Sequence, residues 1–390
     1  MKQAVILAAG EGQRLRPFTV TKPKVMLSIA GKPILHYVVE SLAQNGIRHI
    51  VLIVGYKREQ VFDYLGSGER FGVDITYITQ ERQLGTAHAL TLAKGVAESE
   101  FLVLPADNLI EADTIAQFVT VNPEAVLVKR VDNPLRYGVV TVDGEVVKAI
   151  VEKPRETESN IVNTGIYAFT SEIFNFIEAE LDIPEALSNM LAQGRLINAH
   201  ETQGTWLDVV YPWDILSLND AVLRQIRANL GGTIETGVSL KGLVSVGKDT
   251  IIRSNSYIVG PVVIGNNCDI GPNVCILPAT SIGDNVVISS FSNVKNSVIG
   301  NDVNIGPGCI IQDSVIDSGC IIKGHFTAYS GEADVKVDEH RLVNIGAMLG
   351  EGCNLGNNVV AQPGVIVGNH CQVQALKLLS GRLPDKSLVF

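Results

Sequence analysis

The chain has 390 residues, of which 46% are hydrophobic and 18% are charged. This length is enough for two domains with separate cores, and the composition is that of an ordinary globular protein without a disordered tail. The net charge of −10 argues against nucleic acid as a partner, and no apolar run is long enough to span a membrane. Because residues 1–3 lead straight into an apolar run without a signal peptide, a cytoplasmic location is expected.

Predicted strands and helices alternate over the first 228 residues. The strands are predicted at 4–7, 49–55, 74–79 and 101–104, and the helices at 34–43, 60–65 and 86–97. Such alternation indicates βαβ units and a mainly parallel sheet that binds ligands at the carboxyl ends of its strands. We therefore predict a Rossmann-like α/β domain over residues 1–230, whose last helix, at 216–230, links it to the rest of the chain.

The first strand runs into a glycine-containing loop, L-A-A-G-E-G-Q-R-L-R-P-F-T-V-T-K-P-K. Gly10 and Gly12 allow backbone N–H groups to approach a phosphate chain closely. Four cations that could neutralise the phosphates follow: Arg14, Arg16, Lys22 and Lys24. A dinucleotide-binding loop is disfavoured because Leu15 stands where its third glycine should be. The run predicts a nucleoside triphosphate site.

The second half of the chain is a repeat of six residues. Starting at Val246, every sixth residue is aliphatic as far as Val294; after a slip of one residue the pattern resumes at Ile299, and a second block runs from Val343 to Val373. This period predicts a parallel β-helix of hexapeptide repeats over residues 231–390. Residues 323–342 break the register and are predicted to form a loop. All six cysteines follow residue 260 without metal-site or disulfide spacing, which favours simple burial.

The glycine-containing run resembles the signature of the sugar-1-phosphate nucleotidylyltransferases, L-A-A-G-x-G-T-R-L-x-P with K-P-K downstream, although Gln13 replaces the usual Thr or Ser. The resemblance extends over the whole chain to members with a C-terminal left-handed β-helix, including uridylyltransferases and archaeal thymidylyltransferases. It implies transfer of a nucleotidyl group from UTP or dTTP to a sugar 1-phosphate of the glucose or N-acetylglucosamine type. It also implies that Arg14 and Lys24 are catalytic, and that the loop binds nucleotide through four residues: Leu7, Ala9, Gly10 and Gly12.

Residues 80–87, Q-E-R-Q-L-G-T-A, resemble the family segment that recognises the base. The resemblance implies that Gln80 pairs with a pyrimidine and that Gly85 and Thr86 belong to the nucleotide site. A side-chain amide offers both a donor and an acceptor, which matches the imide edge of a pyrimidine.

Two aspartates occupy the positions of the family's metal ligands. Asp107 lies in L-P-A-D-N, and Asp208 lies in G-T-W-L-D-V. The resemblance implies that both hold Mg²⁺, an ion that usually takes one or two carboxylates and completes its shell with water and phosphate oxygens.

Three further segments, Y-G-V-V, V-E-K-P and N-T-G-I-Y, resemble those that line the family's sugar-phosphate pocket. By position, the residues implied in sugar-phosphate binding are Gly138, Glu152, Lys153 and Asn163.

The segment G-H-F-T-A-Y-S-G at 324–331 resembles the acetyltransferase segment of related β-helices, in which the histidine is a general base. This leaves three alternatives: a bifunctional enzyme that uses His325 and acetyl-CoA, an enzyme limited to nucleotidyl transfer, and a non-catalytic regulatory subunit of the same architecture. Retention of the cations and aspartates favours catalysis. The choice between UTP and dTTP, and the sugar, stay open. Proteins with such a β-helix assemble around threefold axes, so a homotrimer or hexamer is expected.

Overall fold

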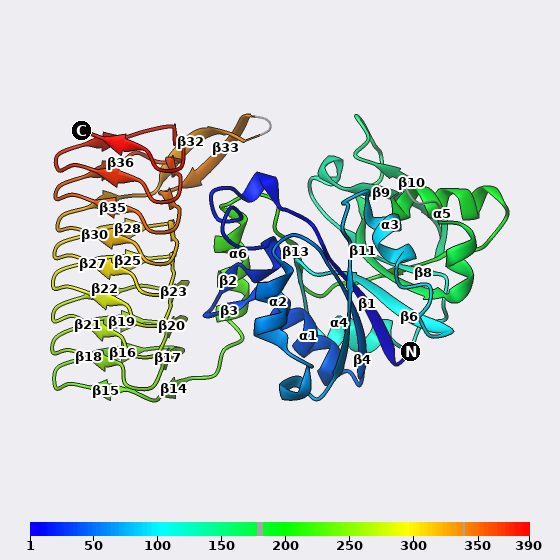
Figure 1. Cartoon of the computed structure of the whole chain (residues 1–390), viewed down its shortest axis with the longest axis horizontal. Helices are drawn as coiled ribbons and strands as arrows, with labels where there is room; N and C mark the ends of the chain where they lie inside the picture. The colour runs from blue at the N-terminus through cyan, green and yellow to red at the C-terminus, as the bar shows by residue number, and fades with distance from the viewer. Residues whose placement is uncertain (178–181, 338–339) are drawn as a thin grey trace. The chain divides into compact units, whose positions relative to one another are not determined.

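The computed structural model describes residues 1–177, 182–337 and 340–390. The chain folds into two compact units. The first consists of Met1–Glu11 and Ile34–Asp208, and the second of Gly12–Pro33 and Val209–Phe390. Segments 12–33 and 209–230, which the sequence assigns to the first domain, therefore group with the C-terminal half of the chain. Figure 1 follows the chain from its N-terminus in blue to its C-terminus in red.

The first unit is built on a nine-stranded sheet. The four strands at one side are parallel, as predicted, whereas β11 pairs antiparallel with both β6 and β8, so the sheet as a whole is mixed. In sheet order the strands are β5 (Asp74–Thr79), β4 (His49–Val54), β1 (Gln3–Ala8), β6 (Glu100–Pro105), β11 (Ile161–Thr170), β8 (Ala125–Arg130), β12 (Asn198–Glu201), β10 (Val146–Glu152) and β9 (Gly138–Asp143).

Helices connect these strands. They are α1 (Ile34–Gln44), α2 (Arg58–Leu65), α3 (Thr86–Thr91), α4 (Ala112–Phe118) and α5 (Ile183–Ala192). Leu90 of α3 and Leu187 of α5 are buried in one cluster with Val5 of β1, so these two helices cover the same face of the sheet. Helix α3 is shorter than predicted, because the chain continues in tight turns in which Ala93 donates to the carbonyl of Leu90.

The second unit contains the parallel β-helix that the repeat predicts, drawn from green to red in Figure 1. Three parallel sheets form its sides, and residues 18 apart, such as Val246 and Ile264, stack in successive coils. One sheet consists of β14 (Asn229–Leu230), β17 (Val244–Val246), β20 (Val262–Ile264), β23 (Thr280–Ile282), β26 (Val298–Ile299), β29 (Val315–Ile316), β34 (Met348–Leu349), β37 (Ile366–Val367) and β40 (Arg382–Leu383). The second runs from β15 (Thr233–Ile234) to β41 (Leu388–Val389), and the third from β16 (Ser239–Lys241) to β39 (Leu378–Leu379).

The aliphatic residue of each hexapeptide points into the β-helix, where Ile252, Ile270 and Ile288 are fully buried. Five of the six cysteines are buried as well, and all six are free thiols. Burial raises the pKa of the Cys268 and Cys309 thiols, so both are protonated at neutral pH. The expectation that the cysteines are buried is confirmed for these five, whereas Cys275 is only partly buried.

The prediction of a loop over residues 323–342 is wrong in its bounds. Ile322 and Ala328 remain in register and are buried, and the residues that leave the β-helix form an antiparallel hairpin of β32 (Gly331–Lys336) and β33 (His340–Ile345). Val343, predicted to begin the second block of the repeat, pairs with Ala333 in this hairpin instead. Residues 338 and 339 lie outside the described part of the chain. The hairpin satisfies its own backbone, so it interrupts the repeat without disturbing the coils on either side.

The linking helix also differs from the prediction at 216–230. Helix α6 covers Asp214–Leu223, and residues 229–230 already form the first strand of the β-helix. The Asp214 carboxylate accepts the backbone N–H groups of Val210 and Tyr211, and these bonds fix the turn before the helix. Among the helices of the described residues, none has the length and apolar character needed to cross a membrane.

Candidate active site

Loops from four parallel strands meet at one edge of the sheet in the first unit. The register sets Leu7, near the end of β1, beside Pro105 at the end of β6, and Ala106 donates its N–H to the carbonyl of Leu7 at 3.1 Å. At the end of β5, Gln80 donates its N–H to the carbonyl of Val54 at 2.7 Å. The predicted nucleotide and metal segments therefore lie along the same carboxyl edge.

Two residues that sequence reasoning missed hold the glycine loop to this edge. Gln83 donates from Nε2 to the carbonyl of Ala9 at 2.6 Å. A Cβ on Gly55, directly after β4, would lie 2.9 Å from the same carbonyl oxygen, so only glycine fits there. Gln83 lies inside the motif at residues 80–87 that also contains Gln80, whereas no sequence motif includes Gly55.

The Gln80 side chain is held in one orientation. It is 5% exposed, its Nε2 donates to the carbonyl of Gly85 at 3.2 Å, and the same nitrogen lies 2.8 Å from Nδ1 of His88. Nearby, the Thr86 N–H and hydroxyl both donate to the Asp182 carboxylate, at 2.9 and 3.0 Å. Sequence reasoning missed His88 and Asp182, because both come from outside the motif that contains Gln80.

The two candidate metal ligands lie on a small antiparallel ribbon. It consists of β7 (Asn108–Ile110) and β13 (Trp206–Asp208), and Asp208 pairs with Asn108, the neighbour of Asp107. Both aspartates are half-buried. Carboxylate oxygens are ligands that Mg²⁺ accepts, and two of them suffice when water and phosphate fill the other positions. The described residues contain no cluster of three or more His, Cys, Asp or Glu that could hold a metal by themselves.

The strand that carries Asp208 is positioned by a tight approach to α4. A Cβ on Gly204, at the start of the G-T-W-L-D segment, would lie 2.3 Å from Oγ1 of Thr114, just inside that helix. Next to this glycine, the Thr205 hydroxyl donates to the Glu111 carboxylate. The position of the strand that carries Asp208 therefore depends on Gly204, which leaves room for Thr114, and on the contact of Thr205 with Glu111.

The predicted sugar-phosphate residues come together on β9, β10 and β11. Gly138 pairs with Glu152, and a Cβ on Gly138 would lie 2.8 Å from the Glu152 Oε2 and 3.6 Å from the Cβ of Asn163. Lys153 follows with its Nζ 3.6 Å from the Glu152 carboxylate, and both side chains are about half exposed. Glycine at 138 thus leaves the space that the glutamate carboxylate occupies.

The buried hydroxyl group of Tyr167 orients the side chain of Asn163. Its Nδ2 donates to the Tyr167 hydroxyl at 2.7 Å, and its Oδ1 accepts the N–H of Gly165 at 2.9 Å. Burial raises the pKa of Tyr167, so the phenol keeps its proton. Sequence reasoning quoted this tyrosine in the N-T-G-I-Y segment without assigning it a role.

The remaining loop residues belong to the second unit. Gly12 has φ +66°, and a Cβ there would lie 2.9 Å from the Cβ of Lys24, so the loop folds back directly onto this lysine. The Thr19 hydroxyl holds the fold by donating to the carbonyl of Gly12 at 2.8 Å. Arg14 is exposed on a 3₁₀ turn over Gln13–Leu15. Leu7, Ala9 and Gly10 belong to the first unit.

His325 occupies a corner of the β-helix, between β30 (Ile321–Ile322) and β31 (Thr327–Ala328). Its φ is +59° and its side chain is exposed. A Cβ on Gly308, in the coil below, would lie 2.7 Å from its Nδ1. His370 stands over Gly352 in the same manner, at 2.4 Å. The imidazole of His325 therefore has a stacking role in the corner, which the sequence pattern did not reveal.

Comparison with known proteins identifies the families to which both halves of the chain are similar. The nucleotidyl transferase family model matches residues 3–225, a hexapeptide transferase model matches 244–278, and a GlmU-like C-terminal hexapeptide model matches 277–342. The chain is 34% identical to the "Bifunctional protein GlmU" of Methanococcus vannielii, over 99% of this chain and 97% of that protein. It is 32% identical to a "Bifunctional sugar-1-phosphate nucleotidylyltransferase/acetyltransferase" of Sulfurisphaera tokodaii, over 95% of each.

A solved structure from Bacillus anthracis, described as a glucose-1-phosphate thymidylyltransferase, is 30% identical with a TM-score of 0.53. It is matched over 97% of its length and covers 58% of this chain. The fold and these similarities define a nucleotidyl transferase with a hexapeptide β-helix. The chain belongs to the nucleotidyl transferase family, and its class of reaction is nucleotidyl transfer to a sugar 1-phosphate.

The orientation of Asn163 can be tested through its buried partner. Tyr167→Phe leaves the Asn163 Nδ2 without its acceptor, so the free energy of unfolding should fall by about 1–3 kcal/mol in urea titrations. Tyr77→Phe is the matched control, because the Tyr77 hydroxyl donates to the carbonyl of Gly66 at an exposed position where water can replace it. Its cost should stay below about 1 kcal/mol. Equal losses in the two variants would contradict the buried bond.

Proposed function

We propose that the protein transfers the nucleotidyl group of UTP or dTTP to a sugar 1-phosphate of the glucose or N-acetylglucosamine type, releasing pyrophosphate. One contact carries the proposal. The Asn108 side chain donates to the carbonyl of Thr164 at 3.1 Å. It ties the residue after Asp107 to the residue after Asn163, and so joins the candidate metal segment to the candidate sugar segment.

Nucleotidyl transfer requires precise positioning of the two substrates rather than acid–base catalysis. A sugar phosphate is already an anionic nucleophile at neutral pH, so the protein needs to align it with the α-phosphorus and stabilise the departing pyrophosphate. In this proposal Gln80 and Gly85 bind the base, and Glu152 and Asn163 bind sugar hydroxyls. Gly138 admits the sugar, Lys153 meets its phosphate, and Arg14 and Lys24 stabilise the leaving group. Asp107 and Asp208 would hold Mg²⁺, which neutralises phosphate charge when bound.

The proposal is tested by incubating the protein with Mg²⁺, each of several nucleoside triphosphates and a panel of sugar 1-phosphates, and measuring pyrophosphate. Activity should require Mg²⁺ and favour a pyrimidine triphosphate. Lys24→Ala should lower kcat by about 10²- to 10³-fold, as expected for loss of one stabiliser of transition-state charge. Lys94→Ala, which removes an exposed lysine from the first unit, should leave kcat unchanged.

Pyrophosphate release that persists in excess chelator would contradict the two-aspartate metal site. Near-normal turnover of Lys24→Ala would remove this lysine from the leaving-group role. A wild-type protein that is inactive on every pair would favour the non-catalytic regulatory subunit.

Acetyl transfer is a second candidate function. The GlmU-like hexapeptide model covers His325, and the M. vannielii and S. tokodaii relatives are both named bifunctional. Under this hypothesis the His325 imidazole accepts a proton from the amino group of an amino-sugar 1-phosphate while that amino group attacks the thioester carbon of acetyl-CoA. The C–S bond breaks, and CoA leaves as the free thiol. Gly324 and Glu332 stand where the acetyltransferase segment that this stretch resembles has Asn and Asp, which counts against it.

Release of free thiol from acetyl-CoA, with glucosamine or galactosamine 1-phosphate as acceptor, measures this activity. If the protein is bifunctional, His325→Ala should abolish thiol release, whereas His370→Ala, which removes a histidine that stands over a glycine at a different corner of the β-helix, should retain it. Loss in both variants would indicate damage to the β-helix rather than a missing base. Absence of thiol release from the wild-type protein would favour an enzyme limited to nucleotidyl transfer.

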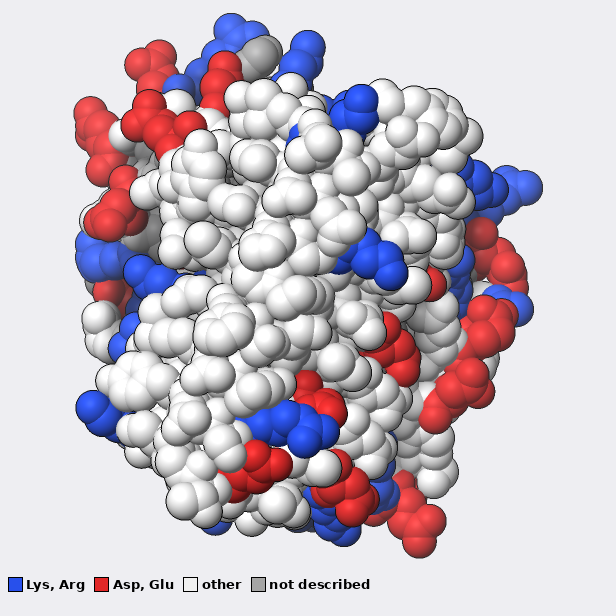
Figure 2. Space-filling view, turned by 90° about the vertical axis from the view of Figure 1, so that its left-hand side faces the viewer, with Lys and Arg blue, Asp and Glu red and all other residues white. Residues whose placement is uncertain are grey.

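We also propose a homotrimer, or a hexamer of paired trimers, assembled through the β-helix. The side of the β-helix viewed in Figure 2 has a broad area without Lys, Arg, Asp or Glu. Large apolar side chains are exposed on the β-helix, including Phe291, Ile310 and Ile321. Burial of such side chains against a symmetric copy would be favourable.

Light scattering at micromolar concentration should give at least three times the chain mass of 41.9 kDa. Phe291→Ser should shift the assembly toward smaller species, because this side chain is 71% exposed in the single chain. A wild-type protein that scatters as a monomer would contradict the proposal.

A further inference from the structure

One corner of the β-helix departs from its repeat at a single position. In the coils from Gly247 to Gly368, the residue after the last inward aliphatic of the β17–β40 sheet is glycine in every coil except one, where it is Asp317. The glycines are needed, because a Cβ on Gly283 would lie 2.3 Å from the Asn301 Oδ1 and one on Gly300 would lie 2.6 Å from the Ser318 nitrogen. A carboxylate in this column is therefore a specific exception.

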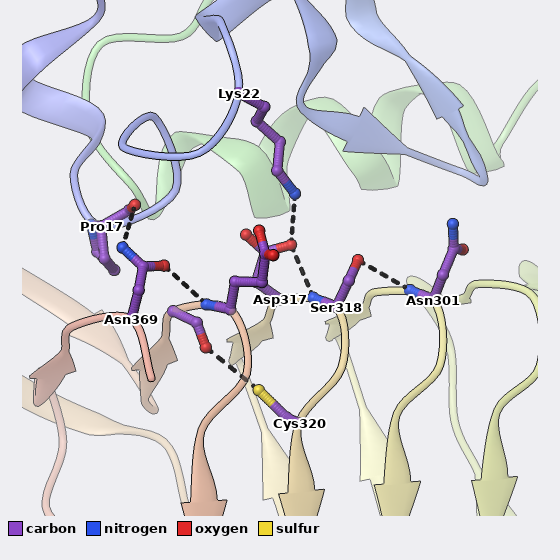
Figure 3. Close-up of polar contacts among 9 residues, drawn as sticks. Pro17, Lys22, Asn301, Asp317, Ser318, Cys320 and Asn369 are labelled. Atoms are coloured by element: carbon purple, nitrogen blue, oxygen red, sulfur yellow. Dashed lines mark hydrogen bonds and ion pairs between the residues drawn. The ribbon is translucent and has the colours of Figure 1, made fainter. Parts of the chain in front are cut away.

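Asp317 supplies a hydrogen-bond acceptor that the regular repeat would take from the next coil. At the next position in each coil, a side-chain oxygen accepts the backbone N–H of the coil before it: Asn301 accepts from Asp284 at 2.9 Å, and Ser318 from Asn301 at 3.2 Å. After Ser318 the hairpin interrupts the repeat. The Ser318 N–H instead donates to Oδ1 of Asp317 at 2.8 Å (Figure 3).

The same carboxylate oxygen accepts a bond from outside the β-helix. Lys22 donates from Nζ to the Asp317 Oδ1 at 2.7 Å, and the side chains of Lys22 and Asp317 are only 21% and 9% exposed. Oδ2 has no hydrogen-bond partner among the described residues. A carboxylate this deeply buried depends on its cation for compensation, so the pair is strongly favoured over separated partners.

A second bond anchors the segment Gly12–Pro33, to which Lys22 belongs. Asn369 donates from Nδ2 to the carbonyl of Pro17 at 3.1 Å, and this bond is buried (Figure 3). Between the segment and the sheet lies a cavity of about 310 Å³, lined by Phe18, Lys22 and Asp317 among others. Together with buried apolar residues such as Phe18 and Leu27, these polar contacts at positions 17 and 22 hold the segment in place.

The anchored segment carries the cations assigned to the leaving group. Arg14 precedes the Pro17 anchor by three residues, and Lys24 follows the Lys22 anchor by two. The Lys24 side chain is also the one that packs against Gly12. We infer that Asp317, a residue of the β-helix, is a positioning residue for nucleotidyl transfer that fixes Lys24 and Arg14 through its ion pair with Lys22. This inference rests on the proposed function.

The test compares Asp317→Asn and Lys22→Met, singly and together, with the wild-type full chain. Each single variant should lower kcat by about 10- to 100-fold, as expected for misplaced catalytic groups, with KM for either substrate changed less than about threefold. The double variant should lose no more than the worse single variant, because both substitutions break the same pair. Asp284→Asn is the matched control, since this carboxylate accepts from Asn266 within the β-helix, and it should keep wild-type kcat.

Amide hydrogen exchange gives a readout independent of activity. The N–H groups of Val20 and Met26 donate within the segment, to the carbonyls of Pro17 and Pro23, so their exchange should accelerate at least tenfold in Asp317→Asn and stay unchanged in Asp284→Asn. Active wild-type protein with normal kcat or normal exchange in Asp317→Asn would overturn this inference and leave the proposed function standing. An inactive wild-type protein would overturn both.

Discussion

Parallel pairing of β1 with β4 and β6 is the constraint on which the candidate site depends. Parallel strands bring their carboxyl ends to one edge, so the chain after β1, the Gln80 loop after β5 and the Asp107 loop after β6 come together although they lie far apart in sequence. Antiparallel β11 then enters beside β6 from that edge, and brings Asn163 toward the same place. The site is a consequence of strand direction.

Glycines and buried hydrogen bonds fix the relative positions of these loops. Gly55, Gly138 and Gly204 stand where a Cβ would strike a carbonyl, a carboxylate or a hydroxyl. Gln83 and Asn108 each hold a neighbouring segment, and Tyr167 holds the Asn163 side chain of its own strand, each by one hydrogen bond of 2.6–3.1 Å. These residues need not touch a substrate, but a binding group is only as well placed as the residues behind it.

The β-helix offers a different kind of scaffold. Its coils repeat so regularly that departures from the repeat are easy to recognise, and the hairpin of β32 and β33 and the carboxylate of Asp317 occur at the same level. In a repeat that stabilises each coil by its neighbours, such departures cost stability unless something compensates. Here the hairpin pairs with itself, and the carboxylate is compensated by Lys22.

The sequence by itself determined the fold class, the hexapeptide β-helix and the strand at Asp74–Thr79, because hydrophobic periodicity is a local property of the chain. It also named Gln80, Asp107 and Asn163 through their motifs. It could not determine that helix α3 ends at Thr91 or that residues after 330 form a hairpin. It also could not determine that His88, Asp182 and Tyr167 bind Gln80, Thr86 and Asn163, respectively. Nor could it relate Lys22 to Asp317, which lie 295 residues apart. Such contacts exist only once distant segments pack together, so tertiary structure alone decided them.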